Sequence, residues 1–489
     1  MAKCTAVIDI GSNSMRMAVF QKTSRFAFHV IHEVKSSVRL SENAYHHDGY
    51  LQPKAMDRTA TALGEFLSVA RSFGARKILC VATSALRDAP NAQEFTSRIR
   101  REYNLSIKII DGQKEAYLGG IACANLLPRM DAVTVDVGGG SSEFTLLKNG
   151  KVETLFSLNI GTVRIKELFL DRDDVEGAAR YIDEALKQLP SFAPSSMLIG
   201  IGGTFRALTR SLMKMENYPL KKLHGYMSDA ERFLEFCDQI QNASVKKLKT
   251  FHIKPDRYDT IKAGALILQR VVRHLGSVRL TCSGVGVREG VFLNDLLRNS
   301  AGMFPANFNP SVRYLLDTYA VHSHHGVECA HLAKRIFDLL QEPLGLERSY
   351  RSELAIAAKL LPVGVGVRYY AYQRHSHYLA LNALDYALTH SQIALISHLL
   401  LFKKGHAASS LILKGMRPLL PDANTFNTLS NILWLSHILL AQRGNSASVS
   451  VEMLNNRLVI SGDHLYLAQE QLKNIVFVPK FNISLHSNR

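Results

Sequence analysis

Cysteine is scarce in this chain, and its spacing excludes the common cysteine-based metal sites. The six cysteines lie far apart, and no two of them have the spacing of a zinc knuckle. They are therefore predicted to be reduced thiols of a protein core, which is their usual state in the cytoplasm. They are Cys4, Cys80, Cys123, Cys237, Cys282 and Cys329.

Long apolar runs are also absent. No apolar stretch reaches the ~20 residues that cross a bilayer, and the first residues are typical of a strand rather than of a signal peptide. The sequence therefore predicts a cytoplasmic protein without membrane association. Its 47% hydrophobic and 21% charged residues are typical of a globular protein. A chain of 489 residues exceeds one ordinary core, so several domains are expected.

Acidic residues are outnumbered by basic ones, which gives a formal net charge of +17. Such an excess indicates a polyanionic partner. Charge alone would fit a nucleic acid, a membrane surface or a long phosphate chain. The basic residues are spread along the chain, which favours a channel for a polyanion over a single basic tail.

What the sequence does contain is a glycine-rich hairpin. A β-branched run at 133–137 predicts a buried strand that contains Asp136, and a return strand begins at Glu143. The turn would present bare amides and hydroxyls to a phosphate. The two acids would repel that phosphate unless a hard cation such as Mg²⁺ lay between them. A plain glycine-rich turn with surface acids is the alternative. The turn residues are Gly138, Gly139, Gly140, Ser141 and Ser142.

A second copy of this layout lies near the N-terminus. Asp9, Gly11 and Ser14 match Asp136, Gly138 and Ser141 at one fixed offset in the sequence. The match predicts a duplicated domain whose two hairpins face one cleft. Arg16 stands where the second copy has Glu143, so one hairpin offers a phosphate-binding cation and the other offers a metal-binding anion. Ser12 and Asn13 complete the first turn.

Further polar residues follow predicted strands. Thr83, Ser84 and Arg87 come after a strand at 77–82 and suit an anion at a helix start. Alternatively, Thr83 or Ser84 caps the helix and Arg87 pairs with Asp88. Glu115 falls one turn into a helix that Asp111 would cap, where an acid usually only favours the helix dipole. Two glycine turns close later strands, at Gly202-Gly203-Thr204 and just before Arg288.

The hairpins Asp9–Arg16 and Asp136–Glu143 resemble the phosphate motifs of the exopolyphosphatase/guanosine pentaphosphatase family, which belongs to the actin-like ATPase superfamily. The resemblance implies an α/β fold: a duplicated actin-like (ribonuclease H-like) ATPase domain, followed by a mostly helical, degenerate HD-like domain. The implied parts are actin-like subdomain I at 1–125, actin-like subdomain II at 126–299, a linker at 300–310 and the C-terminal helical domain at 311–489.

The resemblance also implies an activity. The chain would be a hydrolase that releases terminal phosphate from inorganic polyphosphate, converts guanosine pentaphosphate (pppGpp) to ppGpp, or does both. Glu115 matches the family's proposed general base. Asp136 and Glu143 would hold Mg²⁺, with Asp9 as a further catalytic candidate. The implied phosphate- or substrate-binding residues are Gly11, Ser12, Asn13, Ser14, Arg16, Thr83, Ser84, Arg87, Gly138, Gly139, Gly140, Ser141, Ser142, Gly202, Gly203, Thr204 and Arg288.

The implied partners are inorganic polyphosphate, guanosine polyphosphates or both, and a second copy of the chain in a homodimer; a nucleic acid is not expected. The C-terminal part departs from the family pattern. The place of an HD-type His-Asp dyad reads Leu360-Leu361-Pro362-Val363-Gly364. No catalytic metal is therefore expected there. Arg374, His375 and His377 would instead bind phosphate, close the site or face a twofold partner. The histidines of this region that would otherwise suggest a metal site are His322, His324, His325, His331, His375 and His377.

Two other functions fit the same residues. A kinase or ATPase of the same superfamily would transfer phosphate from ATP to an acceptor, although Arg16 in the first hairpin speaks against it. A non-catalytic sensor would bind guanosine polyphosphates without releasing phosphate. The sequence does not separate polyphosphate from pppGpp as substrate, because both present a terminal anhydride to the same groups.

Overall fold

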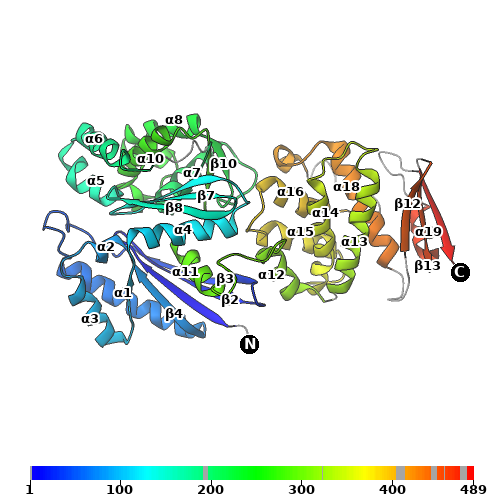
Figure 1. Ribbon diagram of the computed structural model, residues 1–489, viewed down its shortest axis with the longest axis horizontal. Coiled ribbons are helices and arrows are strands. Elements are labelled where there is room, and N and C mark those ends of the chain that lie inside the picture. Colours follow the sequence, from blue (N-terminus) through cyan, green and yellow to red (C-terminus); the bar gives the residue numbers. More distant parts are fainter. Residues whose placement is uncertain are drawn as a thin grey trace. The chain divides into compact units, whose positions relative to one another are not determined.

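The computed structural model describes residues 3–190, 196–321, 323–402, 413–441, 449–455, 457–473 and 482–488. Its contacts divide the chain into two compact units, Met1–Phe308 and Asn309–Arg489. Figure 1 shows the helices and strands of both units, coloured along the chain. His322 lies outside the described residues.

The first sheet of the first unit has five strands in the order β3-β2-β1-β4-β5. Its central strand β1 pairs antiparallel with β2 and parallel with β4. Side chains of β1, β2 and β4 form one hydrophobic core with the helices α1 (Pro53–Ser72) and α3 (Ala92–Tyr103). The strands are β1 (Cys4–Ile10), β2 (Met15–Lys22), β3 (Phe28–Ser36), β4 (Ala75–Ala82) and β5 (Lys108–Ile109).

The second sheet has six strands in the order β10-β11-β9-β6-β7-β8. Its strand β6 pairs antiparallel with β7 and parallel with β9, so β6 has the same neighbours in its sheet as β1 has in the first. The repeated pattern confirms the predicted duplicated α/β architecture. The strands are β6 (Ala132–Val137), β7 (Ser142–Lys148), β8 (Lys151–Leu158), β9 (Met197–Ile201), β10 (Met227–Asp229) and β11 (Arg279–Cys282).

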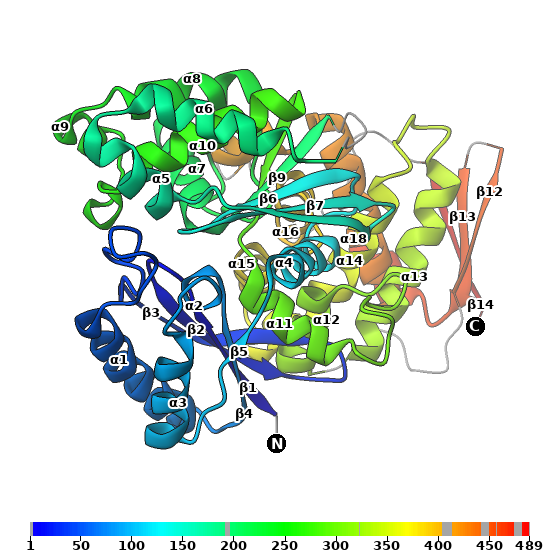
Figure 2. The same cartoon turned by 60° about the vertical axis from the view of Figure 1, so that its left-hand side comes forward.

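Helices cover the second sheet and separate it from the first (Figure 2). The helix α4 (Gly112–Leu126) packs on β6, β7 and β8, and α11 (Val287–Leu296) packs between α4 and the strands β1 and β2. Phe292 of α11 stacks on Phe20 of β2 with ring centroids 4.3 Å apart. The other helical elements are α2 (Ser84–Arg87), α5 (Thr162–Leu168), η1 (Leu170–Arg172), α6 (Val175–Leu186), α7 (Gly202–Met215), α8 (Ala230–Gln241), α9 (Val245–Thr250), η2 (Pro255–Arg257) and α10 (Ile261–Leu275).

The second unit is mostly helical, as predicted, and ends in a three-stranded sheet of order β12-β13-β14. The segment that replaces the His-Asp dyad forms a short 3-10 helix, η3 (Leu361–Gly366). Within the described ranges, no helix is long and apolar enough to span a bilayer. The elements are α12 (Pro310–Tyr319), α13 (Ser323–Leu340), α14 (Tyr350–Leu360), α15 (Tyr372–Ala383), α16 (His390–Leu399), η4 (Lys414–Leu419), α18 (Ala423–Ala441), β12 (Val449–Leu454), β13 (Arg457–Asp463), α19 (Tyr466–Leu472) and β14 (Ile483–Asn488).

The close packing of α11 on α4 yields a prediction for Gly290. A side chain at this position would overlap the carbonyl oxygen of Leu118 in α4. Alanine usually stabilises a helix by about 1 kcal/mol relative to glycine. Here we expect Gly290→Ala to lower the free energy of unfolding by about 1–3 kcal/mol, because the helices must separate. Chemical denaturation measures the change.

The matched control is Gly119→Ala within α4. A methyl group there would meet Cδ1 of Ile201 at 3.4 Å, which is an ordinary contact. We expect this variant to be as stable as the parent chain or slightly more stable. Equal stability of Gly290→Ala and Gly119→Ala would show that the contact between the two helices is not tight.

Candidate active site

The two predicted hairpins have the same backbone structure. The amide of Gly11 donates a hydrogen bond to the carbonyl oxygen of Ser14 at 3.3 Å, and the amide of Gly138 donates to that of Ser141 at 2.9 Å. The aspartate near the end of the first strand of each hairpin lies directly opposite a charged residue of the second strand, and the sign of that charge differs between the two hairpins. Asp9 pairs in register with Arg16, and Asp136 pairs with Glu143. The duplication therefore extends to single residues.

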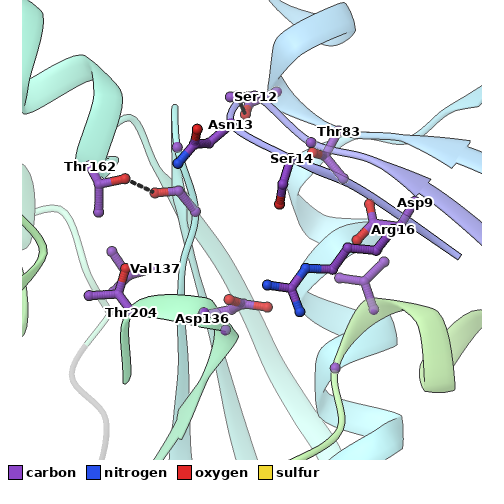
Figure 3. A pocket seen from close by; sticks show the side chains of 18 of the residues that line it. Asp9, Ser12, Asn13, Ser14, Arg16, Thr83, Asp136, Val137, Thr162 and Thr204 are labelled. Carbon is purple, nitrogen blue, oxygen red and sulfur yellow. Dashed lines mark hydrogen bonds between the residues drawn. The ribbon is translucent and has the colours of Figure 1, made fainter. Parts of the chain in front are cut away.

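The two hairpin turns meet across one cavity (Figure 3). A Cβ at Gly139 would lie 2.6 Å from the Cβ of Ser12, and a Cβ at Gly140 would lie 2.9 Å from the Oγ of Ser84. Only glycine fits where the turns come this close. Ser12 Oγ and Ser84 Oγ are themselves 3.1 Å apart, within hydrogen-bonding distance. The cleft that the sequence predicts between the two hairpins is therefore present.

Most of the predicted site residues line this cavity. Figure 3 shows Asp9, Ser14 and Arg16 on one side of it and Asp136 and Thr204 on the other. Gly202, with a φ of 84°, passes directly beneath Asp136, because a side chain there would overlap the aspartate carboxylate. The predicted residues in the lining are Asp9, Gly11, Ser12, Asn13, Ser14, Arg16, Thr83, Ser84, Glu115, Asp136, Gly138, Gly139, Gly202, Gly203, Thr204 and Arg288.

The other predicted residues, all in described parts of the chain, are not in that lining: Arg87, Gly140, Ser141, Ser142 and Glu143. The hydroxyl of Ser142 donates to the carbonyl oxygen of Ile160. Glu143 is 2% exposed, and its Oε1 accepts a hydrogen bond from Ser157 Oγ at 3.0 Å. Its Oε2 is buried and accepts no hydrogen bond from a described residue.

Arg87 is held by protein groups instead of opening into the cavity. Its Nη1 donates to Glu115 Oε2 at 3.0 Å and to the carbonyl oxygen of Ile110 at 3.2 Å. Its Nη2 donates to Ser141 Oγ at 3.1 Å, and its Nε lies 3.5 Å from Asp88. These contacts tie Arg87 to Glu115, and the direct phosphate contact expected from the sequence stays a prediction.

Glu115 is positioned by the start of α4. As predicted, Asp111 caps this helix, with its Oδ1 accepting from the amide of Lys114 at 2.7 Å. Glu115 follows in the first turn and is 8% exposed. Burial, together with the charge of Glu143, raises the pKa of Glu115 well above its usual range, and the Arg87 guanidinium opposes this rise. A carboxylate with a raised pKa is a stronger base than an exposed glutamate.

The neighbouring acids are also buried. Burial raises the pKa of Asp136 to about 6, against the opposing charge of Arg206. It raises the pKa of Glu143 to about 7 and raises that of Asp9 as well. Ionising several buried carboxyl groups in one region therefore costs free energy of folding. A bound cation would reduce this cost.

Four arginines line the same cavity: Arg16, Arg206, Arg257 and Arg288. Burial and the charges of the other three lower the pKa of Arg16 to about 10. Arg288 pairs with Glu33 at 3.1 Å, whereas Arg16 and Arg257 form no ion pair with any carboxylate of the described chain. Such crowded positive charge suits an anionic ligand with several negative charges.

Arg206 and Arg257 were missed by the sequence-based prediction. Arg206 lies one helical turn after Gly202 in α7, so its place after a strand-ending glycine could have revealed it. Its guanidinium donates to the carbonyl oxygens of Ser283 and Val285. Arg257 is the last residue of the short 3-10 helix η2 and belongs to no sequence motif. It lines the cavity only because the fold brings η2 next to the hairpins.

Arg164 links the two halves of the site. Its Nε donates to the carbonyl oxygen of Gly140 at 2.9 Å, and its Nη2 lies 3.0 Å from Asp88. Its guanidinium also lies over the Tyr45 ring, 4.7 Å from the centroid. Because Asp88 also contacts Arg87, a chain of charged groups runs from the second hairpin to Glu115.

The buried Glu143 should make stability depend on pH. Its pKa is about 7 in the folded chain and about 4.5 in the unfolded one. The folded state therefore holds one more proton between these values, and the free energy of unfolding falls as the pH rises through this window. Glu143→Gln removes that loss. We expect the variant to be more stable by about 1–3 kcal/mol above pH ~7 and equally stable below pH ~4.5.

Denaturation at a series of pH values tests this expectation. Glu65→Gln is the control, because Glu65 is exposed on α1 and should show no such difference. A stability gain of Glu143→Gln that stays constant across the pH range would contradict the assignment of a buried, protonated acid.

Comparison with known proteins identifies the family. Residues 18–299 match the Ppx/GppA phosphatase family, and residues 309–475 match domain III of Ppx/GppA phosphatases. The chain is 28% identical over 313 residues to exopolyphosphatase 2 of Mycobacterium tuberculosis, covering 59% of this chain and 97% of that protein. It is 30% identical over 290 residues to a bifunctional 3-dehydroquinate synthase/phosphatase of Fusobacterium nucleatum, covering 55% of this chain and 43% of that protein. The match thus spans less than half of the Fusobacterium protein.

Solved structures agree with this assignment. A Ppx/GppA family member of Aquifex aeolicus is 28% identical, with a TM-score of 0.53, over 61% of this chain and 99% of that one. An exopolyphosphatase of Cytophaga hutchinsonii is 24% identical, with a TM-score of 0.55, over 60% of this chain and 98% of that one; it supports the fold alone. From the two family matches and the shared fold, we conclude that this chain belongs to the Ppx/GppA phosphatase family.

Proposed function

We propose that the chain hydrolyses the terminal phosphoanhydride of inorganic polyphosphate, of pppGpp, or of both. The observation that carries this proposal is the cavity in which two equivalent hairpins face each other with four arginines and the carboxyl group of Glu115. A terminal phosphate would be held from both sides by backbone amides. The exopolyphosphatase of M. tuberculosis among the relatives supports this substrate class.

The hairpins and arginines would stabilise the transition state. Phosphoryl transfer passes through a loose transition state with charge spread over the phosphate oxygens, so positioning and charge neutralisation carry most of the catalysis. One hydrogen bond closes each turn, from the amide of Gly11 to Ser14 and from the amide of Gly138 to Ser141, so the remaining turn amides are held in place before any ligand arrives. Arg16 forms no ion pair with a carboxylate of a described residue, although its side chain lies near Asp9 and Asp136 (Figure 3). Fixed donors of this kind need no rearrangement during the reaction.

Glu115 would act as the general base. A water molecule attacks the terminal phosphorus, its proton passes to a carboxylate oxygen of Glu115, and the bond to the bridging oxygen breaks to leave the shortened chain. Burial provides a carboxyl group with a raised pKa, and the hydrogen bond from Arg87 holds its orientation. Arg164 and Asp88 would support Arg87 as positioning residues.

The carboxylates fit a Mg²⁺ ion. Asp136 lines the cavity, and the buried Oε2 of Glu143, which accepts no hydrogen bond from a described residue, suits a nearby cation. In the described chain, no group of three or more His, Cys, Asp or Glu side chains could hold a metal. Mg²⁺ is usually bound by one or two carboxylates, with water and substrate phosphates as the remaining ligands. When bound, it would neutralise charge on the terminal phosphate.

The role of Glu115 can be tested by Glu115→Gln. The amide keeps an acceptor for Arg87 but cannot take the proton from water. We expect the rate of phosphate release to fall at least about 100-fold, while equilibrium binding of polyphosphate stays nearly unchanged. Glu65→Gln on the exposed face of α1 should leave both quantities unchanged. If binding is lost together with turnover, Glu115 is a binding residue and the proposed role is wrong.

The role of Asp136 can be tested through the metal dependence. We expect Asp136→Asn to raise the Mg²⁺ concentration for half-maximal phosphate release by about tenfold or more. The control is Asp173→Asn at an exposed position, which should leave this Mg²⁺ concentration unchanged. A Mg²⁺ requirement that Asp136→Asn does not alter would place the metal elsewhere.

The preferred substrate is decided by a separate measurement. Phosphate release from polyphosphate and from pppGpp is compared side by side in the presence of Mg²⁺.

A further inference from the structure

A second hollow lies next to the candidate active site. It shares Arg16, Gly203 and Arg257 with the first cavity. A Cβ at Gly203 would lie 2.5 Å from Nη2 of Arg257, so this guanidinium lies directly over the glycine backbone where the two hollows meet. Beyond this point the second hollow is lined by Lys35, Arg210, His252 and Lys254, among others.

The charge of this second hollow is strongly positive. Arg16, Lys35, Arg210, Lys254 and Arg257 contribute five basic side chains. Its one acidic lining residue is Asp256, whose Oδ2 already lies 2.8 Å from Lys35 Nζ. Burial lowers the pKa of Arg257, and Arg206 and Arg210 lower it further, although Asp256 and Asp259 oppose this. The basic side chains of this hollow therefore outnumber the carboxylates that could neutralise them.

We propose that this hollow, the outer anion site, binds the phosphates that follow the terminal one in a polyphosphate chain. The proposal rests on the proposed function, which places the terminal phosphate between the two hairpins. A chain leaving that position past Arg16 and Arg257 would enter the outer anion site directly, because both residues line both hollows. The site would increase affinity for long chains over short ones.

The lining favours inorganic phosphates over a nucleotide base. Arginine guanidinium groups bind phosphate oxygens in pairs, and lysine binds them as a point charge. Of the described residues that line the outer anion site, none is a phenylalanine, tyrosine or tryptophan, and the ring available for stacking on a base is the exposed imidazole of His252. The same cations could instead hold the 3′-diphosphate of pppGpp, since its phosphate chemistry is the same. The experiment below separates these two sources.

The double variant Arg210→Gln/Lys254→Gln tests the outer anion site. Both side chains are exposed and neither lines the first cavity. With the 489-residue chain and Mg²⁺, kcat/KM is measured for long-chain polyphosphate and for tripolyphosphate. We expect the ratio of the two values to fall about tenfold or more, mainly through KM. The control is Arg100→Gln/Arg101→Gln, which removes the same charge from an exposed part of α3 and should preserve the ratio.

Two outcomes would overturn the proposal: an unchanged ratio in the Arg210/Lys254 variant, or an equal fall in both double variants, which would show only the effect of net charge. A fall in kcat/KM for pppGpp relative to GTP, without a fall in the polyphosphate ratio, would overturn the inorganic-chain assignment and give the site to the nucleotide's 3′-diphosphate.

The same variants separate this proposal from the proposed function. If the parent chain releases phosphate from no substrate, the proposed function fails, and equilibrium binding of labelled long-chain polyphosphate then decides the outer anion site. Weaker binding by the Arg210/Lys254 variant than by the Arg100/Arg101 variant would support the site. Equal binding by the two variants would overturn it.

Discussion

The close approach of two glycine turns determines the rest of this structure. At Gly139 and Gly140, side chains from the other half of the domain fill the space that a Cβ would need. Each turn ends the central strand pair of its own sheet, so the two sheets must be held at a fixed separation to bring the turns together. The packed helices α4 and α11 provide that separation. The fold therefore positions donors from two distant parts of the sequence around one small volume.

The same volume holds charges that oppose folding. Buried carboxyl groups have raised pKa values, and Arg16 and Arg257 have lowered ones, because each group would be better solvated in water. This cost is reasonable in a site that binds an anion together with a cation, since the ligands supply the missing opposite charges. The chain of contacts from Arg164 through Asp88 and Arg87 to Glu115 shows how part of the charge is balanced within the protein.

Local features of this protein could be predicted from sequence. The two hairpins, the cap of α4 by Asp111 and the strand that precedes Gly202 each depend on a few neighbouring residues. The duplication was predictable because it repeats residue types at a fixed offset. Contacts between segments that are distant in the sequence were not predictable. The sequence did not reveal that Arg87 contacts Glu115 and Ser141, because these partners come from other elements. Arg257 follows no motif and reaches the site only because η2 packs near Gly203.

The central claim is that both hairpins hold the same terminal phosphate. A crystal structure of the Glu115→Gln chain with polyphosphate and Mg²⁺ tests it most directly. The account predicts a terminal phosphate that accepts hydrogen bonds from amides of both turns, those of residues 12–14 and those of residues 139–141. A phosphate bound by one hairpin alone, or bound away from this cavity, would contradict the account.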